Sequence, residues 1–257
     1  MKNKKRILQP ALAAFILTIL FVPVSFSGNL PTHSQLQTTL RTVVKEDNGG
    51  FGFDMWATIV DRDGTVKTVA FSGQVRDDQW PGSRVISAQK ANTANAFSLP
   101  GLALSTANLF SAVQPGGSLY GLQFSNPVAT DVAYRGPATD FGTAKDPMVG
   151  HMAGGVNVFG GGLPLYDSAG KLVGTLGVSG DSSCADHNIA WKVLHMLDLD
   201  NIPKGVSPTK DDNIVYDITN GTSAGGWGHP ECAPAATRIA KELPKTSPIG
   251  PNKLTKN

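Results

Sequence analysis

Residues 53–71, FDMWATIVDRDGTVKTVAF, decide the fold, because they place two β-rich runs on either side of a turn sequence. Valine, isoleucine, threonine and aromatic residues predict one strand at 53–60 and a second at 65–71. The DRDG sequence at 61–64 is typical of the turn in an antiparallel hairpin. Asp-x-Asp-Gly also occurs in calcium loops, but the other oxygen ligands of such a loop are missing, so we interpret it as a turn.

A second hairpin and several helices surround this hairpin in the sequence. Strands are predicted at 163–166 and 171–178, around a turn at 167–170. Apolar residues at helical spacing and helix-capping residues predict helices at 32–47, 83–98, 104–112 and 182–199. Hairpins with helices segregated from them indicate an α+β fold, an antiparallel sheet flanked by helices, rather than a doubly wound sheet.

Two long stretches of the chain show little periodicity. Residues 114–155 are rich in Gly and Pro and longer than an ordinary loop, so we predict an insertion. Pro, Gly and Asn are also dense over 201–257, which predicts an irregular C-terminal extension. Residues from about 28 to 200, with the insertion included, have the length of a single domain.

The first 27 residues have the features of a secretory signal. Four basic residues precede an apolar run at 11–24, which is too short to span a bilayer. Ser25-Phe26-Ser27 then places small residues where a signal peptidase needs them. We predict a signal peptide over 1–27 and a periplasmic or secreted mature protein without a membrane span. An uncleaved anchor is the alternative, because Ser-x-Ser is a weaker cleavage site than Ala-x-Ala.

Composition excludes several classes of protein. Hydrophobic residues make up 40% of the chain, which excludes a disordered or collagen-like protein. Charged residues make up only 16%. Loss of the basic leader would change the formal net charge from +2 to −2. Such a charge-poor, slightly acidic surface predicts no nucleic-acid partner.

The chain has two cysteines, Cys184 and Cys232. In an exported protein two cysteines most often form a disulfide, here between the start of the last predicted helix and the C-terminal extension. Closing a loop of this length contributes about 3–4 kcal/mol to stability. The alternative is a pair of thiols that bind a metal, but neither cysteine belongs to a C-x-x-C motif.

Histidines occur in two of the predicted helices. His187, Trp191 and His195 share one face of the last helix, and we predict that this ridge is exposed to solvent or to another subunit. Its two histidines are roughly 12 Å apart along the helix, too far to share one metal ion. His33 lies on the apolar face of the first helix, where its imidazole could ligate iron or donate to a backbone carbonyl. The residues alone favour the carbonyl.

Four strings carry a resemblance to a known family. They are IVDRDG at 59–64, KANTANAF at 90–97, QPGGSLYGLQ at 114–123, and FGGGLP at 159–164 leading into GTLGVSG at 174–180. In this order and spacing, residues from about 32 to 199 resemble the GlcG/HbpS family of haem-binding or haem-degrading domains. The C-terminal domain of PduO-type cobalamin adenosyltransferases is related to that family.

This resemblance implies a profilin-like fold, a homo-oligomer and a bound haem or related tetrapyrrole. Lys90 would pair with a propionate, and Thr93 would approach the iron or the porphyrin edge. A flat ring would meet exposed backbone at a glycine turn, and His33 would be the metal ligand. The implied cofactor-binding residues are His33, Lys90, Thr93, Phe159, Gly160, Gly161 and Gly162. The stretch at about 128–156 and the extension depart from the family pattern and could cover this site.

The sequence therefore predicts an exported haem-binding protein that acts in haem capture, storage or sensing. One alternative is a haem-degrading or other small-molecule-converting enzyme that uses the same pocket. Another is a ligand-free interaction module that uses the His187–Trp191–His195 ridge. No phosphate loop, zinc motif or pair of carboxylates on one helix face assigns a catalytic residue.

Overall fold

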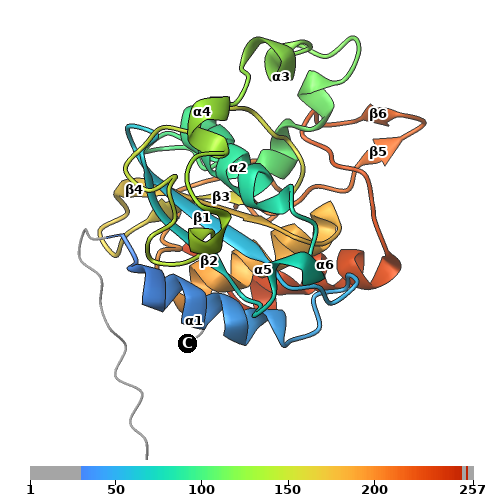
Figure 1. Ribbon diagram of the computed structural model, residues 1–257. Helices are drawn as coiled ribbons and strands as arrows, with labels where there is room; N and C mark the ends of the chain where they lie inside the picture. The colour runs from blue at the N-terminus through green and yellow to red at the C-terminus, as the bar shows by residue number, and fades with distance from the viewer. Residues whose placement is uncertain (1–29, 251–252, 254–257) are drawn as a thin grey trace, which may run out of the picture.

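The computed structural model describes residues 30–250 and 253, so the predicted signal peptide over 1–27 lies outside the described residues. Four strands form an antiparallel sheet in the order β2-β1-β4-β3. The strands are β1 (Trp56–Asp61), β2 (Val66–Phe71), β3 (Gly162–Tyr166) and β4 (Leu172–Ser179). Both predicted hairpins form, and they join where β1 pairs with β4. The predicted α+β fold is confirmed (Figure 1).

Helices cover both faces of this sheet. α2 (Ser83–Phe97) lies on one face, and α1 (His33–Val44) and α5 (Ser183–Met196) lie on the other (Figure 1). α1 begins at a capping box, in which the side chains of Thr32 and Gln35 each accept a hydrogen bond from the other residue's backbone N–H.

Side chains that alternate along each strand contribute to two hydrophobic cores, one on each face of the sheet. Ala57 and Ile59 of β1 belong to the core with α1 and α5. Their neighbours Trp56 and Val60 belong to the core with α2. Successive side chains of a strand point to opposite faces, so one strand serves both layers.

The small residues of α2 allow it to pack closely on the sheet. Ala88 and Ala91 are fully buried, and Ser87 Oγ lies 2.7 Å from Thr58 Oγ1. A Cβ atom at Gly177 of β4 would overlap the carbonyl oxygen of Ser87. Glycine is needed at this close backbone approach.

Short helical segments connect the first hairpin to α2 and α2 to β3. The segment before α2 is η1 (Arg76–Asp78). Two 3-10 turns occur where the sequence predicts one short helix at 104–112. The segments after α2 are η2 (Thr106–Leu109), η3 (Ser111–Val113), α3 (Leu122–Ser125), α4 (Thr130–Ala133) and η4 (Ala138–Asp140).

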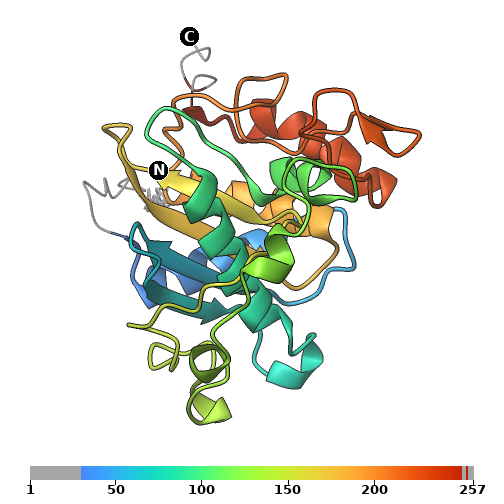
Figure 2. The ribbon, with the colours of Figure 1, turned by 90° about the horizontal axis from the view of Figure 1, so that it is seen from above.

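A buried ion pair fixes the insertion to α2. Arg84 Nε donates to Asp146 Oδ2 at 2.8 Å, and Arg84 Nη2 donates to Asp146 Oδ1 at 2.5 Å. The Arg84 guanidinium also lies 3.7 Å from the centre of the Phe141 ring. At the sheet edge the Val66 N–H donates to the His151 carbonyl at 2.9 Å. The insertion therefore covers β2, on the side of the molecule opposite the C-terminal extension (Figure 2).

The sequence predicts an irregular C-terminal extension, but the structure shows regular elements in it. It contains a short hairpin, β5 (Ile218–Thr219) with β6 (Thr222–Ser223), and α6 (Pro234–Thr246). α6 begins with a proline in its first turn, a position that proline favours, and packs on α5. The density of Pro and Gly before it conceals its amphipathic pattern.

The prediction that the His187–Trp191–His195 ridge on α5 is exposed is wrong. His187 and Trp191 are fully buried, because α6 and the extension cover this face of α5. The Trp191 indole donates to the Ser247 carbonyl at 2.8 Å. Only His195 of the three residues stays partly exposed, with Nδ1 2.8 Å from Asp200 Oδ2.

The predicted disulfide is confirmed. Cys184 and Cys232 are joined with a Cα–Cα distance of 6.0 Å, across a sequence separation of 48. The bond fastens the extension to the N-terminal end of α5.

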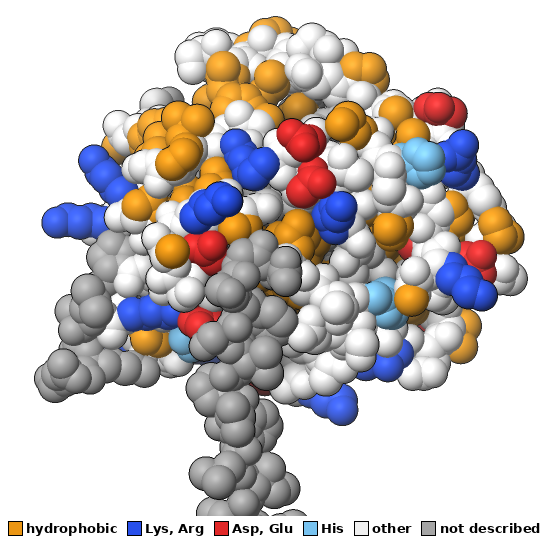
Figure 3. All heavy atoms as spheres, turned by 90° about the vertical axis from the view of Figure 1, so that its left-hand side faces the viewer, with side chains coloured by type: hydrophobic (Ala, Val, Ile, Leu, Met, Phe, Trp, Pro, Cys, Tyr) orange, Lys and Arg blue, Asp and Glu red, His pale blue; other side chains and the backbone are white. Residues whose placement is uncertain are grey.

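The surface carries charges of both signs. Basic and acidic side chains are interspersed on the face in Figure 3, where apolar side chains also reach the surface. Among the described residues, no helix combines the length and the apolar character that crossing a membrane requires.

Asp212 of the extension is a fully buried carboxyl group. Neither of its oxygens accepts a hydrogen bond from another of the described residues. Burial, and then the nearby Asp211, raise the pKa of Asp212 to about 8. The folded protein therefore keeps a proton on Asp212 at pH values where the unfolded chain has lost it.

Stability is expected to fall as pH rises through this range. Well below pH 8 each pH unit costs about 1.4 kcal/mol, because the folded state binds one more proton than the unfolded state, and the slope falls to about half of that at pH 8. We expect the wild type to lose about 2 kcal/mol between pH 6.5 and 8 relative to Asp212→Asn. Urea unfolding of both proteins at several pH values measures this difference. Parallel pH profiles would contradict the raised pKa.

Candidate functional site

Lys90, a predicted ligand-binding residue, is fully buried. Its Nζ donates to Asp186 Oδ2 at 2.6 Å and to the Val178 carbonyl at 3.1 Å. Burial lowers the pKa of Lys90 and raises that of Asp186 to about 6, while attraction between the two groups opposes both shifts. The ammonium belongs to an internal ion pair, so a propionate would have to compete with Asp186.

The glycine turn at Gly160–162 packs against protein. A Cβ atom at the first glycine would overlap the backbone of α5, and one at the second would overlap β4. The third glycine N–H donates to Thr106 Oγ1 at 2.9 Å, and the second glycine carbonyl accepts from the Val178 N–H at 2.8 Å. Phe159, just before the turn, is 47% exposed. Of this predicted group, the aromatic ring is the part that solvent reaches.

Thr93 and His33 lie in different layers. Thr93 Oγ1 donates to the Gln89 carbonyl at 2.7 Å and accepts from the Asn157 N–H at 2.9 Å. His33, on α1 across the sheet, has Nε2 2.9 Å from the Gly142 carbonyl. The structure thus brings Lys90, Thr93 and the glycine turn together around α2 and leaves His33 apart. Their roles toward haem stay predictions.

Two histidines that the sequence analysis did not place in the site lie beside this group. His187 and His229 are both buried. Burial lowers the pKa of His187 to about 3 and that of His229 to about 4, and the nearby charge of Lys90 lowers each pKa further. Both imidazoles are therefore neutral at pH 7. Buried titratable groups gathered in this way are typical of functional sites.

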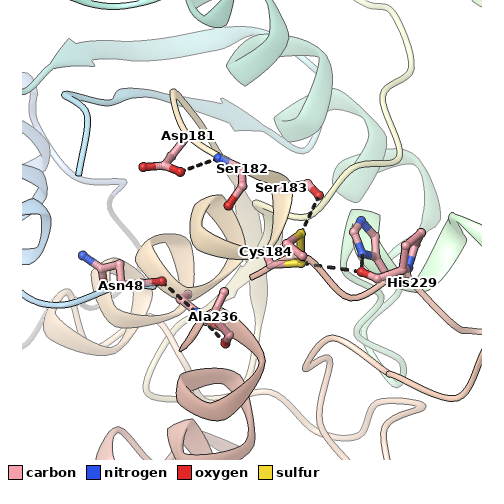
Figure 4. The surroundings of a disulfide bond; sticks show 10 residues. Asn48, Asp181, Ser182, Ser183, Cys184, His229 and Ala236 are labelled. Atoms are coloured by element: carbon pink, nitrogen blue, oxygen red, sulfur yellow. Dashed lines mark hydrogen bonds between the residues drawn. A yellow bond between two sulfur atoms is a disulfide. The ribbon is translucent and has the colours of Figure 1, made fainter. Parts of the chain in front are cut away.

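The disulfide brings the two histidines together. His187 is three residues after Cys184 in α5, and His229 is three residues before Cys232. Figure 4 shows the His229 segment lying against the N-terminal end of α5 at this bond.

An aromatic wall separates His229 from a cavity. The Phe110 ring lies 5.1 Å from the His229 ring and 6.5 Å from the Phe159 ring. Phe110 and Pro230 also line a cavity of about 670 Å³ between residues 110–118 and the β5–β6 hairpin. This volume is in the usual range for ligand pockets. Figures 1 and 2 show these two segments side by side.

Residues 32–195 match the family model described as haem degrading protein, HbpS-like. The chain belongs to this family. The predicted resemblance is confirmed, and the matched region of this HbpS-like protein ends before the extension that carries His229.

Solved structures with similar folds include a complex of PduOC with haem, which is 25% identical with a TM-score of 0.44. That alignment covers 65% of this HbpS-like protein and 94% of PduOC. The Klebsiella pneumoniae protein ORFY of family DUF336 is 24% identical with a TM-score of 0.43, covering 69% and 97% of the two chains. No curated protein matches the chain.

The donor set limits which metal centres fit this HbpS-like protein. Among the described residues, no group of three or more His, Cys, Asp or Glu side chains could hold a metal ion. A single neutral imidazole fits a metal that brings most of its own ligands, as iron does in haem.

Proposed function

We propose that this HbpS-like protein is an exported haem-binding protein that acts in haem capture, storage or sensing. The observation that carries the proposal is the family match over residues 32–195. A cavity of ligand size supports it, as does the buried, neutral His229, whose ring packs against the cavity-lining Phe110. Export is supported by the basic and apolar leader and by the disulfide, a bond typical of oxidising compartments.

A homo-oligomer is part of this proposal. Phe51, Phe53 and Trp80 are exposed and form a cluster with ring centroids 5.2–6.3 Å apart. Contiguous exposed aromatic surface is typical of an interaction site. Light scattering of the purified protein would measure the mass of the assembly.

The test is titration of the mature chain, beginning at Gly28, with haemin. We expect a saturable shift of the Soret band, because a protein ligand to the iron and an apolar pocket both change the haem spectrum. Apomyoglobin is the positive control, and buffer without protein is the blank. A spectrum that stays equal to that of free haemin at all ratios would refute haem binding.

Turnover of haem is the second candidate function, because the family description names haem degradation. Adding ascorbate and oxygen to the loaded protein distinguishes the two candidates. Loss of the Soret band with release of iron would identify an enzyme, whereas a stable band would identify a binding protein.

A further inference from the structure

We infer that His229 of the C-terminal extension is a ligand of the haem iron, and that the cavity between residues 110–118 and the β5–β6 hairpin receives the porphyrin. This inference rests on the proposed function. It places the iron ligand in the extension, outside the family match over residues 32–195, whereas one wall of the cavity, residues 110–118, lies inside the matched region.

The hydrogen bonding of His229 leaves a nitrogen lone pair unused. Nδ1 lies 2.7 Å from the Pro230 carbonyl, and because a carbonyl only accepts, Nδ1 carries the proton. Nε2 of the neutral ring is then a bare acceptor, and it has no partner among the described residues. Histidines that bind metals almost always donate their second ring N–H to a carbonyl, carboxylate or water. His229 already has this arrangement.

The other buried histidine has the opposite arrangement. His187 Nε2 accepts from the Ile214 N–H at 3.1 Å, so its neutral ring carries the proton on Nδ1. Its unpartnered nitrogen, Nδ1, is therefore a donor and cannot ligate a metal. His33 has Nε2 engaged with Gly142 and lies on the other face of the sheet. Of these three histidines, His229 is the one with a free lone pair.

The coordination requirement also favours a porphyrin. His229 has no group of metal-binding side chains around it among the described residues. A porphyrin supplies four nitrogen ligands itself and needs only one or two from the protein. Coordination forms one Fe–N bond with the lone pair of Nε2, while Nδ1 keeps its proton, so the step releases no proton from the imidazole.

The cavity wall next to His229 can accept a flat apolar ring. Phe110 and Ile218 give it apolar surface, and Cβ atoms at Gly116 or Gly221 would meet nothing within 4 Å. Phe110 contacts both the cavity and the His229 ring. Binding at this site requires the half-buried Phe110 side chain, which lies against the His229 ring, to rotate, and rotation of a side chain at a surface is an ordinary movement.

The experiment compares haemin titrations of the wild type, His229→Ala, the rival-ligand variant His33→Ala, and the matched control His151→Ala, which replaces an exposed histidine. We expect His229→Ala to weaken binding by more than about 100-fold, the upper range for loss of an outer-shell partner of a metal. Free imidazole should restore the iron–nitrogen signature in the electron paramagnetic resonance spectrum of His229→Ala. The control His151→Ala should keep the wild-type Soret band, and His33→Ala tests the rival ligand on α1.

A second variant tests the cavity without changing His229. Thr222 lines the cavity from an exposed position on β6, so Thr222→Trp should fill it while leaving the fold intact. We expect weaker binding with an unchanged melting temperature. Circular dichroism of each variant confirms folding before titration.

The outcomes separate this inference from the proposed function. If the wild type gives no saturable Soret shift, the proposed function fails. If the wild type binds haemin and His229→Ala and Thr222→Trp bind it equally well, haem binding stands and the assignment of His229 is overturned. If only His33→Ala loses the Soret shift, the iron ligand is His33 on α1 and the assignment of His229 is overturned.

Discussion

Replacing Asp186 with alanine is expected to lower the free energy of unfolding by about 3–5 kcal/mol, the range for breaking a buried ion pair from one side. The change leaves the Lys90 ammonium buried, with the Val178 carbonyl as its one remaining hydrogen-bond acceptor among the described residues. It also removes the acceptor for the Asp181 N–H, which lies 2.9 Å from Asp186 Oδ1. Urea unfolding followed by circular dichroism measures the loss.

The matched control removes both charges. Lys90→Met/Asp186→Leu replaces the pair with apolar groups of similar size, and such replacements of buried pairs are often neutral or stabilising. The double variant should therefore be more stable than Asp186→Ala. If the double variant is instead the less stable of the two, the ion pair contributes net stability and the argument from an uncompensated charge is wrong.

This pair also changes how a Lys90 variant is interpreted. Lys90→Ala would leave Asp186 buried without its cation and create a cavity beside the glycine turn. Loss of haem binding in that variant would report damage to the fold as readily as loss of a propionate contact. Lys90→Met in the double variant separates the two effects, because it keeps the volume.

The sheet could be predicted from sequence because its signals are local. The turn at 61–64 and the alternation along 56–60 lie within one hairpin, and they produce β1 and β2 as expected. The capping box at Thr32 is likewise complete within four residues. Each of these features depends on neighbours in the chain, so pattern alone is sufficient.

The site could not be predicted in the same way because its partners are remote. Lys90 and Asp186 are separated by 96 residues, and no pattern in the α2 segment indicates that its lysine is buried. The sequence predicts an exposed ridge on α5 because it does not predict α6, the helix that covers this ridge. α6 lies in a segment dense in Pro and Gly.

One signal for the site was nevertheless present in the sequence. The predicted Cys184–Cys232 bond, taken together with His187 and His229 at three residues from either cysteine, already placed two histidines near each other. What the sequence did not contain was the tautomer of each ring. That depends on the Ile214 and Pro230 backbone groups, whose positions follow from the path of the extension.

Removing the disulfide with Cys184→Ser/Cys232→Ser is expected to lower the free energy of unfolding by about 4 kcal/mol. The bond closes a loop of 48 residues, and its loss restores the corresponding conformational entropy to the unfolded chain. Both cysteines are replaced because a single replacement would leave a free thiol. Denaturant unfolding of the double variant and of the wild type, each with and without dithiothreitol, measures the effect.

The same variant should also lose affinity for haemin in solution conditions where it stays folded. Cys232 holds the segment of His229 against α5, so without the bond this segment must be ordered when the ligand binds. Ordering free backbone costs about 1–2 kcal/mol per residue, which predicts weaker binding without a change in the iron ligand. The electron paramagnetic resonance spectrum of the saturated variant should therefore equal that of the wild type. A weaker affinity accompanied by a different spectrum would show that the bond determines which residue ligates the iron, because the imidazole would then have been replaced rather than released.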